Sequence, residues 1–302
     1  MQLPLATESE LREIESAAGI FAAQAGQILL EYFRGEPKIQ YKGPNNTDPV
    51  TEADLKSEEF LRDAINKRFP EHGIVGEEGK LVEGDTTARE WVWVLDPLDG
   101  TSNFIKKLPF FAVSIGILHR SIPVCGAIFI PVSPTLAPSL FHGRLGGGAY
   151  LGDTPLSLTT PLPAERVKLS NNVGAWVMRN QNQDKKGHLD TRNLGSIAVE
   201  AACVSCGTLE VAGFRAPKVW DVAAGIPIVK EAGGLIFEKG PKEKEWAQFS
   251  SFGPPDSTLN NLAKWRKQIV LGSPQVITGP LQVQPTGVLG TVSVFLQKLG
   301  FK

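Results

Sequence analysis

The sequence predicts a layered fold of the mixed α/β class. Candidate helices and strands alternate along the chain, which favours helices packed in layers on sheets. A chain of 302 residues is long enough to bury one large core or two smaller ones. Its 42% hydrophobic and 21% charged residues are typical of a globular protein, and no repeat or clean linker interrupts it.

The charge balance argues against several classes of partner. The 31 basic and 32 acidic residues nearly cancel, so nothing favours binding to nucleic acid or to a charged membrane surface. The apolar stretch from Val288 to Phe301 is too short to span a bilayer, which needs about 20 residues. Three cysteines make no disulfide framework and no secretory signal is visible, so a cytoplasmic location is expected.

Two helices are predicted near the N-terminus. Thr7 opens a capping-box pattern, and apolar residues then recur every three or four positions as far as Tyr32. Residues 42–50 are rich in Pro, Gly and Asn and predict a loop. Thr51 is the expected N-cap of the second helix, and Asp54 lies in the first turn of that helix.

Two acidic segments follow predicted strands in the centre of the chain. A short strand at 74–75 leads to Glu77, which lies in a turn bounded by glycines. The apolar run 91–95 predicts a buried strand that ends in a turn holding Asp96 and Asp99. A helix is expected to start directly after this turn.

The second half of the chain continues the alternation. Two neighbouring strands are predicted within residues 111–130, and Ser196 precedes an apolar helix. Asp221 is expected at the N-cap of a helix over residues 222–232. Beyond Gly240 the chain is aperiodic and rich in Pro, Gly and Ser, which predicts a divergent tail.

Five carboxylates share one kind of position, because each lies at the end of a predicted strand or at the start of a predicted helix. Hard oxygen ligands there suit a divalent cation such as Mg²⁺, and the N–H groups of a helix start attract an anion. Ordinary capping and turn formation are the alternative interpretation of each residue alone. The five residues are Asp54, Glu77, Asp96, Asp99 and Asp221.

Around these carboxylates the chain resembles the inositol monophosphatase family of metal-dependent, lithium-sensitive phosphatases. The resemblance extends over about residues 10–240 and follows the order of the family's motifs. The main matching segments are 50–54, 76–78, 93–104, 220–225 and 231–234, with subsidiary matches at 109–116, 146–149 and 192–196. Together these matches are far more specific than any one of the acidic residues.

The resemblance implies a site for two Mg²⁺ ions. Glu77, Asp96 and the backbone carbonyl of Leu98 would hold one ion. Asp96, Asp99 and Asp221 would hold the second, with Asp96 bridging the two. Glu77 would also help to hold a third, loosely bound ion.

The resemblance also implies the catalytic roles. Thr101 would orient a water molecule that attacks phosphorus directly, and Asp54 would accept a hydrogen bond from the Thr101 hydroxyl. Glu77 completes the expected catalytic set. The N–H groups of Gly100 and Thr101, together with Asp99 and Asp221, would surround the phosphate.

The architecture implied by the resemblance is an αβαβα sandwich. We expect residues 1–165 to form an α+β half that carries most metal ligands. Residues 166–302 would then form an α/β half with Asp221 and the substrate pocket, ending in a divergent tail from about residue 241. Members of the family are often dimers, so a homodimer is expected.

The predicted substrate is a small phosphorylated metabolite, an inositol phosphate or another polyol or sugar-like phosphate. Gly195, Ser196, Ile197 and Phe214 are the expected contacts. Phe214 stands where inositol-specific relatives have an acidic residue, and a phenyl ring cannot accept a hydrogen bond from a polyol hydroxyl. Histidinol-phosphatase, fructose-1,6-bisphosphatase and 3'(2'),5'-bisphosphate nucleotidase activities therefore stay open. A non-catalytic metal-binding partner protein is the alternative of another class.

Overall fold

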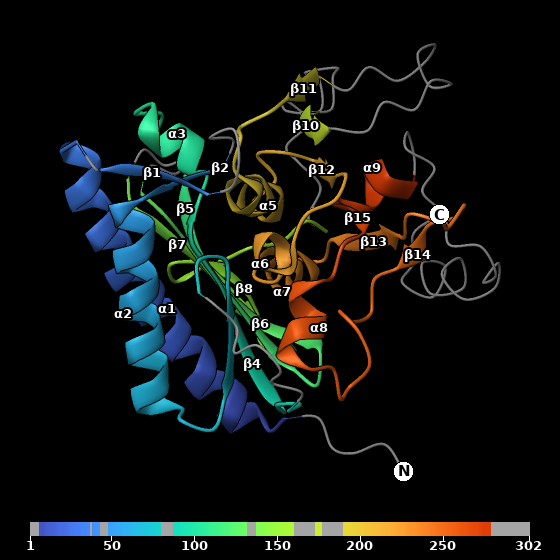
Figure 1. Cartoon of the computed structure of the whole chain (residues 1–302). Helices are drawn as coiled ribbons and strands as arrows, with labels where there is room; N and C mark the ends of the chain where they lie inside the picture. The colour runs from blue at the N-terminus through green and yellow to red at the C-terminus, as the bar shows by residue number, and fades with distance from the viewer. Residues whose placement is uncertain are drawn as a thin grey trace.

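The computed structural model describes residues 6–36, 38–42, 48–79, 87–131, 137–159, 173–176 and 190–278, and these form five stacked layers (Figure 1). The outer layer is the helix pair α1 (Glu8–Arg34) and α2 (Glu52–Arg68), which packs on a first sheet. A middle layer of helices separates this sheet from a second sheet, which α9 (Pro274–Thr278) covers. The predicted mixed α/β class and the αβαβα sandwich are confirmed.

Within the described residues, the first sheet has the strand order β3-β4-β5-β6-β7-β8-β9. β3 and β4 are parallel, and the other neighbouring pairs are antiparallel. The strands are β3 (Gly73–Gly76), β4 (Trp91–Asp99), β5 (Ala112–His119), β6 (Ile122–Ile130), β7 (Ser139–Arg144), β8 (Gly148–Leu151) and β9 (Thr154–Pro155).

The second sheet has the order β11-β10-β12-β15-β13-β14 in the part of the chain that the structure describes. Its strands are β10 (Val173–Trp176), β11 (Asp190–Arg192), β12 (Val211–Phe214), β13 (Leu235–Lys239), β14 (Ala247–Gln248) and β15 (Gln268–Gly272). The middle layer consists of α5 (Ile197–Ser205), α6 (Val219–Val222) and α7 (Gly225–Glu231). The short helices α3 (Thr101–Ile105) and α8 (Leu259–Ala263) lie at the edges of the first sheet.

The two N-terminal helices begin where their capping signals predict. The Thr7 hydroxyl accepts a hydrogen bond from the N–H of Glu10, and the Glu10 carboxylate accepts one in return from the N–H of Thr7. Thr51 and Asp54 form the same reciprocal pair at the start of α2. Capping needs only residues three apart in the chain, which explains why this prediction is confirmed.

The predicted loop over residues 42–50 is wrong in part. β1 (Ile39–Lys42) and β2 (Asp48–Thr51) pair antiparallel, with Ile39 opposite Thr51. Proline and asparagine favour a loop, but the pairing partner of a short edge strand decides whether the strand forms. The strand leads directly into α2 and delivers Thr51 to its capping position.

The prediction of a divergent, aperiodic tail beyond Gly240 is also wrong for the residues that the structure describes there. β15 lies inside the second sheet, between β12 and β13, and its residues Ile269, Val270 and Leu271 are buried. A strand covered on both faces lacks the alternation that reveals a half-exposed strand. The apolar segment 288–301 lies outside the described residues.

The division of the chain near residue 165 stays a prediction. The two sheets separate between β9 and β10, on either side of that position. One hydrophobic core nevertheless joins them, because it contains Val92 and Ile128 of the first sheet as well as Leu271 of the second. Across the described segments, every helix is too short or too polar to cross a bilayer.

Candidate active site

The central acidic segment is a bulged strand and not the turn that the sequence predicts. β4 continues through Asp99, and its register against β5 shifts between Asp96, opposite Ser114, and Asp99, opposite Ala112. Three steps along β4 thus oppose two steps along β5, which is the signature of a β-bulge. A bulge redirects side chains, and here Asp96 and Asp99 are only 2% and 9% exposed.

Glu77 reaches the same edge of the sheet from the neighbouring strand. β3 and β4 are parallel, so their carboxyl ends lie together, and the N–H of Glu77 donates to the carbonyl of Leu95 at 3.1 Å. Since Leu95 directly precedes Asp96, this hydrogen bond places Glu77 next to Asp96 on the neighbouring strand. The structure therefore brings these two predicted metal ligands together.

Asp54 and Thr101 form the expected hydrogen bond. One Asp54 oxygen accepts from the hydroxyl of Thr101 at 3.1 Å, and the other accepts from the N–H and hydroxyl of Thr51 at 2.8 and 2.6 Å. The Thr101 hydroxyl also lies 3.1 Å from the carbonyl of Leu98. Its single proton is therefore committed to one of two acceptors, which leaves the oxygen lone pairs to accept from a third group.

The turn after β4 needs glycine at its first position. Gly100 has a φ of 92°, and a Cβ there would lie 2.7 Å from the carbonyl oxygen of Phe110. Only glycine adopts this left-handed conformation at so tight a contact without strain. The conformation allows β4 to lead directly into α3, so that Thr101 follows the acidic bulge.

The prediction that Asp221 is a helix N-cap is wrong. The helix expected over residues 222–232 is divided into α6 and α7; Lys218 is the N-cap of α6, and Asp221 is its third residue. The Asp221 carboxylate accepts a hydrogen bond from the N–H of Lys218 at 2.6 Å. The residues that follow approach the first sheet closely, because a Cβ on Gly126 would overlap Ala224.

α5 is tied directly to the acidic bulge. The hydroxyl of Ser196 donates to Asp99 at 2.9 Å, and the N–H of Ala198 donates to the same Asp99 oxygen. The predicted apolar helix starts directly after Ser196, which caps α5 by accepting from the N–H of Val199. Glu200, an acid in an otherwise apolar helix, accepts from the N–H of Leu194 at 2.7 Å.

Burial and mutual repulsion dominate the electrostatics of this region. Burial, followed by the charges of Glu77, Asp99, Asp221 and Asp54, raises the pKa of Asp96 well above its ordinary value. Burial and the charge of Asp221 raise the pKa of Asp99 to about 7. Burial also raises the pKa of Asp221 to about 6, although Lys218 and Arg266 act in the opposite direction, and burial raises the pKa of Asp54.

This donor set fits a divalent cation by its chemistry. Carboxylate oxygens are the ligands that Mg²⁺ prefers, and buried like charges become stable when a cation joins them. Among the residues described, no three acidic, histidine or cysteine side chains lie close enough together to bind one metal ion. Two of the proposed ligands, Asp99 and Asp221, also accept hydrogen bonds from the N–H groups of Ala198 and Lys218.

A cavity of about 270 Å³ is lined by Asp221 and by the expected contacts Gly195, Ser196, Ile197 and Phe214, whereas Asp99, Gly100 and Thr101 do not line it. Its lining residues are Asn193, Gly195, Ser196, Ile197, Glu200, Phe214, Arg215, Ala216, Pro217 and Asp221. Phe214 lines this cavity, but it is only 3% exposed and also packs in the shared core, so its contact with the substrate stays a prediction. Arg215 is exposed instead. Arg215 follows the last residue of β12, so it lies outside the strand that buries Phe214.

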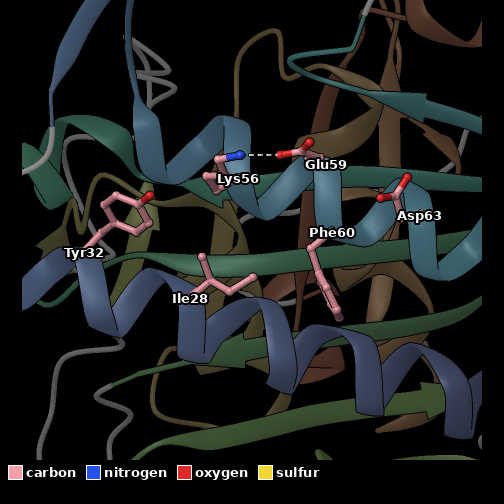
Figure 2. Close-up of a pocket in the computed structure, with 6 residues that line it drawn as sticks. All are labelled: Ile28, Tyr32, Lys56, Glu59, Phe60 and Asp63. Carbon is pink, nitrogen blue, oxygen red and sulfur yellow. Dashed lines mark hydrogen bonds and ion pairs between the residues drawn. The ribbon is translucent and has the colours of Figure 1, made fainter.

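A larger cavity, of about 370 Å³, lies between α1 and α2 (Figure 2). Its lining residues are Ile28, Tyr32, Lys56, Glu59, Phe60 and Asp63. None of the five carboxylates lines it, and Lys56 and Glu59 already pair at 2.7 Å. We therefore place the candidate site beside the smaller cavity, which Asp221 lines and whose Ser196 binds Asp99.

The chain is similar to known proteins over most of its length. The model of the inositol monophosphatase family matches residues 10–269. Inositol monophosphatase 1 of Solanum lycopersicum is 33% identical over 251 residues, covering 79% of this chain and 89% of that protein. The Nus factor SuhB of Pasteurella multocida is 34% identical over 226 residues, covering 71% and 81%.

A solved structure shows the same relationship. The inositol monophosphatase from Anabaena superposes with a TM-score of 0.62 at 26% identity, covering 92% of this chain and 98% of that one. The family match also extends to the start of β15, beyond residue 241, where the sequence predicts a divergent tail. The chain belongs to the inositol monophosphatase family and is a phosphoric monoester hydrolase.

Proposed function

We propose that this protein is a Mg²⁺-dependent phosphomonoesterase acting on a small polyol or sugar-like phosphate. The observation that carries the proposal is that the Asp96 carboxyl is buried close to four other carboxylates. Burial and these four charges raise the pKa of Asp96. Such an arrangement is costly unless a cation neutralises it. The family is generally metal-dependent, and lithium sensitivity is typical of it.

The residues that would hold the cation are those that the family resemblance implies. Glu77, Asp96 and the Leu98 carbonyl are proposed for one Mg²⁺, and Asp96, Asp99 and Asp221 for a second. Bound Mg²⁺ supplies positive charge to the phosphate and lowers the pKa of an attacking water. A third ion beside Glu77 belongs to the same proposal.

Thr101 and Asp54 are proposed to orient the nucleophile. Because the Thr101 proton is donated to Asp54 or to the Leu98 carbonyl, the hydroxyl oxygen is left to accept a hydrogen bond from water. Asp54 in turn is held by Thr51, so the pair cannot rotate freely. A positioned water attacks phosphorus directly in this scheme, and the N–H groups of Gly100 and Thr101 would bind the phosphate oxygens.

The leaving alcohol would occupy the cavity beside Asp221. Gly195, Ser196 and Ile197 form one part of its wall, and its volume of about 270 Å³ suits a small metabolite. Phe214 lines the cavity but is 3% exposed, so its ring offers little surface for stacking on a base or imidazole. An inositol phosphate is the leading candidate substrate.

The decisive experiment is phosphate release from inositol monophosphate and from a panel of other phosphate esters. We expect release with Mg²⁺, loss of release on chelation with EDTA, recovery on adding Mg²⁺ back, and inhibition by Li⁺. Folded protein that binds Mg²⁺ but hydrolyses no ester on the panel would contradict the proposal. That result would favour the alternative of a non-catalytic metal-binding partner protein.

Arg215 favours a second candidate substrate class. Its exposed guanidinium lines the cavity, where it can pair with a second anionic group on the leaving alcohol, as in fructose-1,6-bisphosphate or a nucleoside bisphosphate. Arg215→Met would then lower kcat/KM for such an ester by roughly 2- to 5-fold, the scale of an exposed ion pair, and leave inositol monophosphate unchanged. Lys264→Met, which removes an exposed cation from α8, is the matched control. Equal kcat/KM changes for both ester classes would exclude this candidate.

The remaining expectations concern assembly and location. The homodimer and the cytoplasmic location stay predictions, and a plant relative from Arabidopsis thaliana is named a chloroplastic phosphatase. Sedimentation or light scattering of the purified protein measures the first directly.

A further inference from the structure

Glu58 on α2 is a buried carboxylate that the proposed function does not use. It is 3% exposed, and each of its two oxygens faces a different donor. Oε1 accepts from Nε of Arg62 at 2.6 Å, and Oε2 accepts from the backbone N–H of Glu78 at 2.8 Å. Glu58 therefore joins α2 to the loop that carries Glu77.

The loop around Glu77 lies directly against this pair. A Cβ on Gly79 would overlap the Arg62 guanidinium, and a Cβ on Gly76 would overlap Oε1 of Glu58. On the other side, the N–H of Glu77 donates to the carbonyl of Leu95 in β4. The backbone of Gly76–Gly79 is thus held between β4 and the Glu58–Arg62 pair.

The same face of α2 supports two other parts of the site. Asp54, Ser57 and Glu58 are spaced at i, i+3 and i+4, so their side chains lie together. Asp54 binds Thr101, and the Ser57 hydroxyl donates to the carbonyl of Pro97 at 2.9 Å, within the acidic bulge. One helical turn therefore contacts the water-orienting residue, the bulge and the glutamate loop.

We propose that Glu58 and Arg62 are positioning residues that fix the loop of Glu77 so that its carboxylate can serve a divalent cation beside Asp96. The inference rests on the proposed function, because it assigns Glu77 to the cation. A carboxylate is required at position 58, since both neighbours are donors and only a carboxylate offers an acceptor to each. Arg62 supplies the positive charge that keeps Glu58 from adding to the repulsion around Asp96.

The test compares Glu58→Gln with Glu59→Gln, its exposed neighbour on the same helix, which pairs with Lys56. A glutamine at position 58 presents a donor to either Arg62 or the Glu78 N–H, so one of the two hydrogen bonds is lost. Partners that orient metal ligands typically change metal affinity about 10-fold or more when they are removed. We expect E58Q to bind Mg²⁺ or Mn²⁺ about 10-fold more weakly in calorimetry, and E59Q to bind as the wild type does.

Kinetics separates positioning from a general structural role. E58Q should need about 10-fold more Mg²⁺ for half-maximal activity, with kcat at saturating Mg²⁺ and KM for the ester close to wild type. If E58Q does not fold, Arg62→Lys takes its place. Lysine keeps the positive charge but cannot donate as the guanidinium does, so it should weaken Mg²⁺ binding in the same direction and by less.

Two outcomes would overturn the inference. One is a folded E58Q, or in its place R62K, that binds the cation as tightly as the wild type and E59Q do. The other is a variant that loses kcat at saturating Mg²⁺ with unchanged cation affinity. If the wild type binds Mg²⁺ but hydrolyses no ester, only the proposed function is contradicted. The Mg²⁺ affinities of E58Q and E59Q would still test the role of Glu58.

Discussion

Glu15 and Asp96 are both buried carboxylates, 7% and 2% exposed, yet their surroundings shift their pKa values in opposite directions. Burial raises the pKa of Glu15, but hydrogen bonds from His142 and Arg144 outweigh it and leave that pKa below its ordinary value. Around Asp96, burial and the charges of four other acids act together, and the pKa rises.

The difference lies in what the fold provides for each charge. Glu15 on α1 receives Nη1 of Arg144 at 2.6 Å and Nδ1 of His142 at 2.8 Å, both from β7. Lys218 and Arg266 reduce the pKa of Asp221, but neither offsets the burial of that carboxyl. A buried charge that side chains neutralise is a structural element, whereas a group of buried charges left in mutual repulsion marks a place where a ligand must act.

The largest effect is expected from removing the central charge of the repulsive group. Asp96→Asn should lower Mg²⁺-dependent phosphate release at least about 100-fold, because the proposed bridging ligand loses its charge and one acceptor. Phosphate release under saturating ester measures it. Near-wild-type release would show that Asp96 is not a metal ligand.

Replacing a carboxylate by an amide should change the free energy of unfolding in opposite directions at Asp96 and at Glu15. In EDTA, D96N should unfold at the same or a higher denaturant concentration than the wild type, because the substitution relieves repulsion. Glu15→Gln should lower the free energy of unfolding by about 2 kcal/mol, because Arg144 and His142 lose their buried charged partner. Denaturant titrations of the two variants with chelator give the comparison, and equal destabilisation would refute the distinction between the regions.

The smallest effect concerns the pH dependence of stability. His142 donates to two acceptors, Glu15 and the Gly152 carbonyl, so both ring nitrogens need a proton. The hydrogen bond to Glu15 raises the pKa of His142 above 6.5, and the pKa of Glu15 lies below 4.5. The contribution of the pair is therefore complete from about pH 4.5 to 6.5; it is lost as pH rises through the folded pKa of His142 and as pH falls through that of Glu15.

His142→Gln tests this dependence. The wild type should lose a few tenths to about 1 kcal/mol of unfolding free energy between mildly acidic and mildly alkaline pH, on the scale of a partly exposed ion pair. The variant should lose less over the same interval. Denaturant titrations in EDTA at a series of pH values give the unfolding free energy of each protein. Parallel curves of unfolding free energy against pH for wild type and variant would contradict the prediction.

Local signals in the sequence determined much of this molecule. The capping boxes of Thr7 and Thr51 and the cap at Ser196 place three helix starts, since each depends on residues two to four positions apart. The acidic residues at strand ends, together with their family motifs, identified the carboxylates that the structure gathers around Asp96. The family and the kind of reaction follow from these residues alone.

Contacts between distant segments decided the rest. β15 is a central strand only because β12 and β13 flank it, and a short apolar run does not reveal its neighbours. Phe214 is buried as the last residue of β12, whereas Arg215 lies just after that strand and is exposed. Glu58 meets the Glu78 N–H only once α2 packs on the first sheet. Sequence by itself determined which residues are the candidates for the chemistry, because motifs and caps are local. Tertiary structure alone decided how they are oriented and neutralised, because burial and charge compensation depend on partners far apart in the chain.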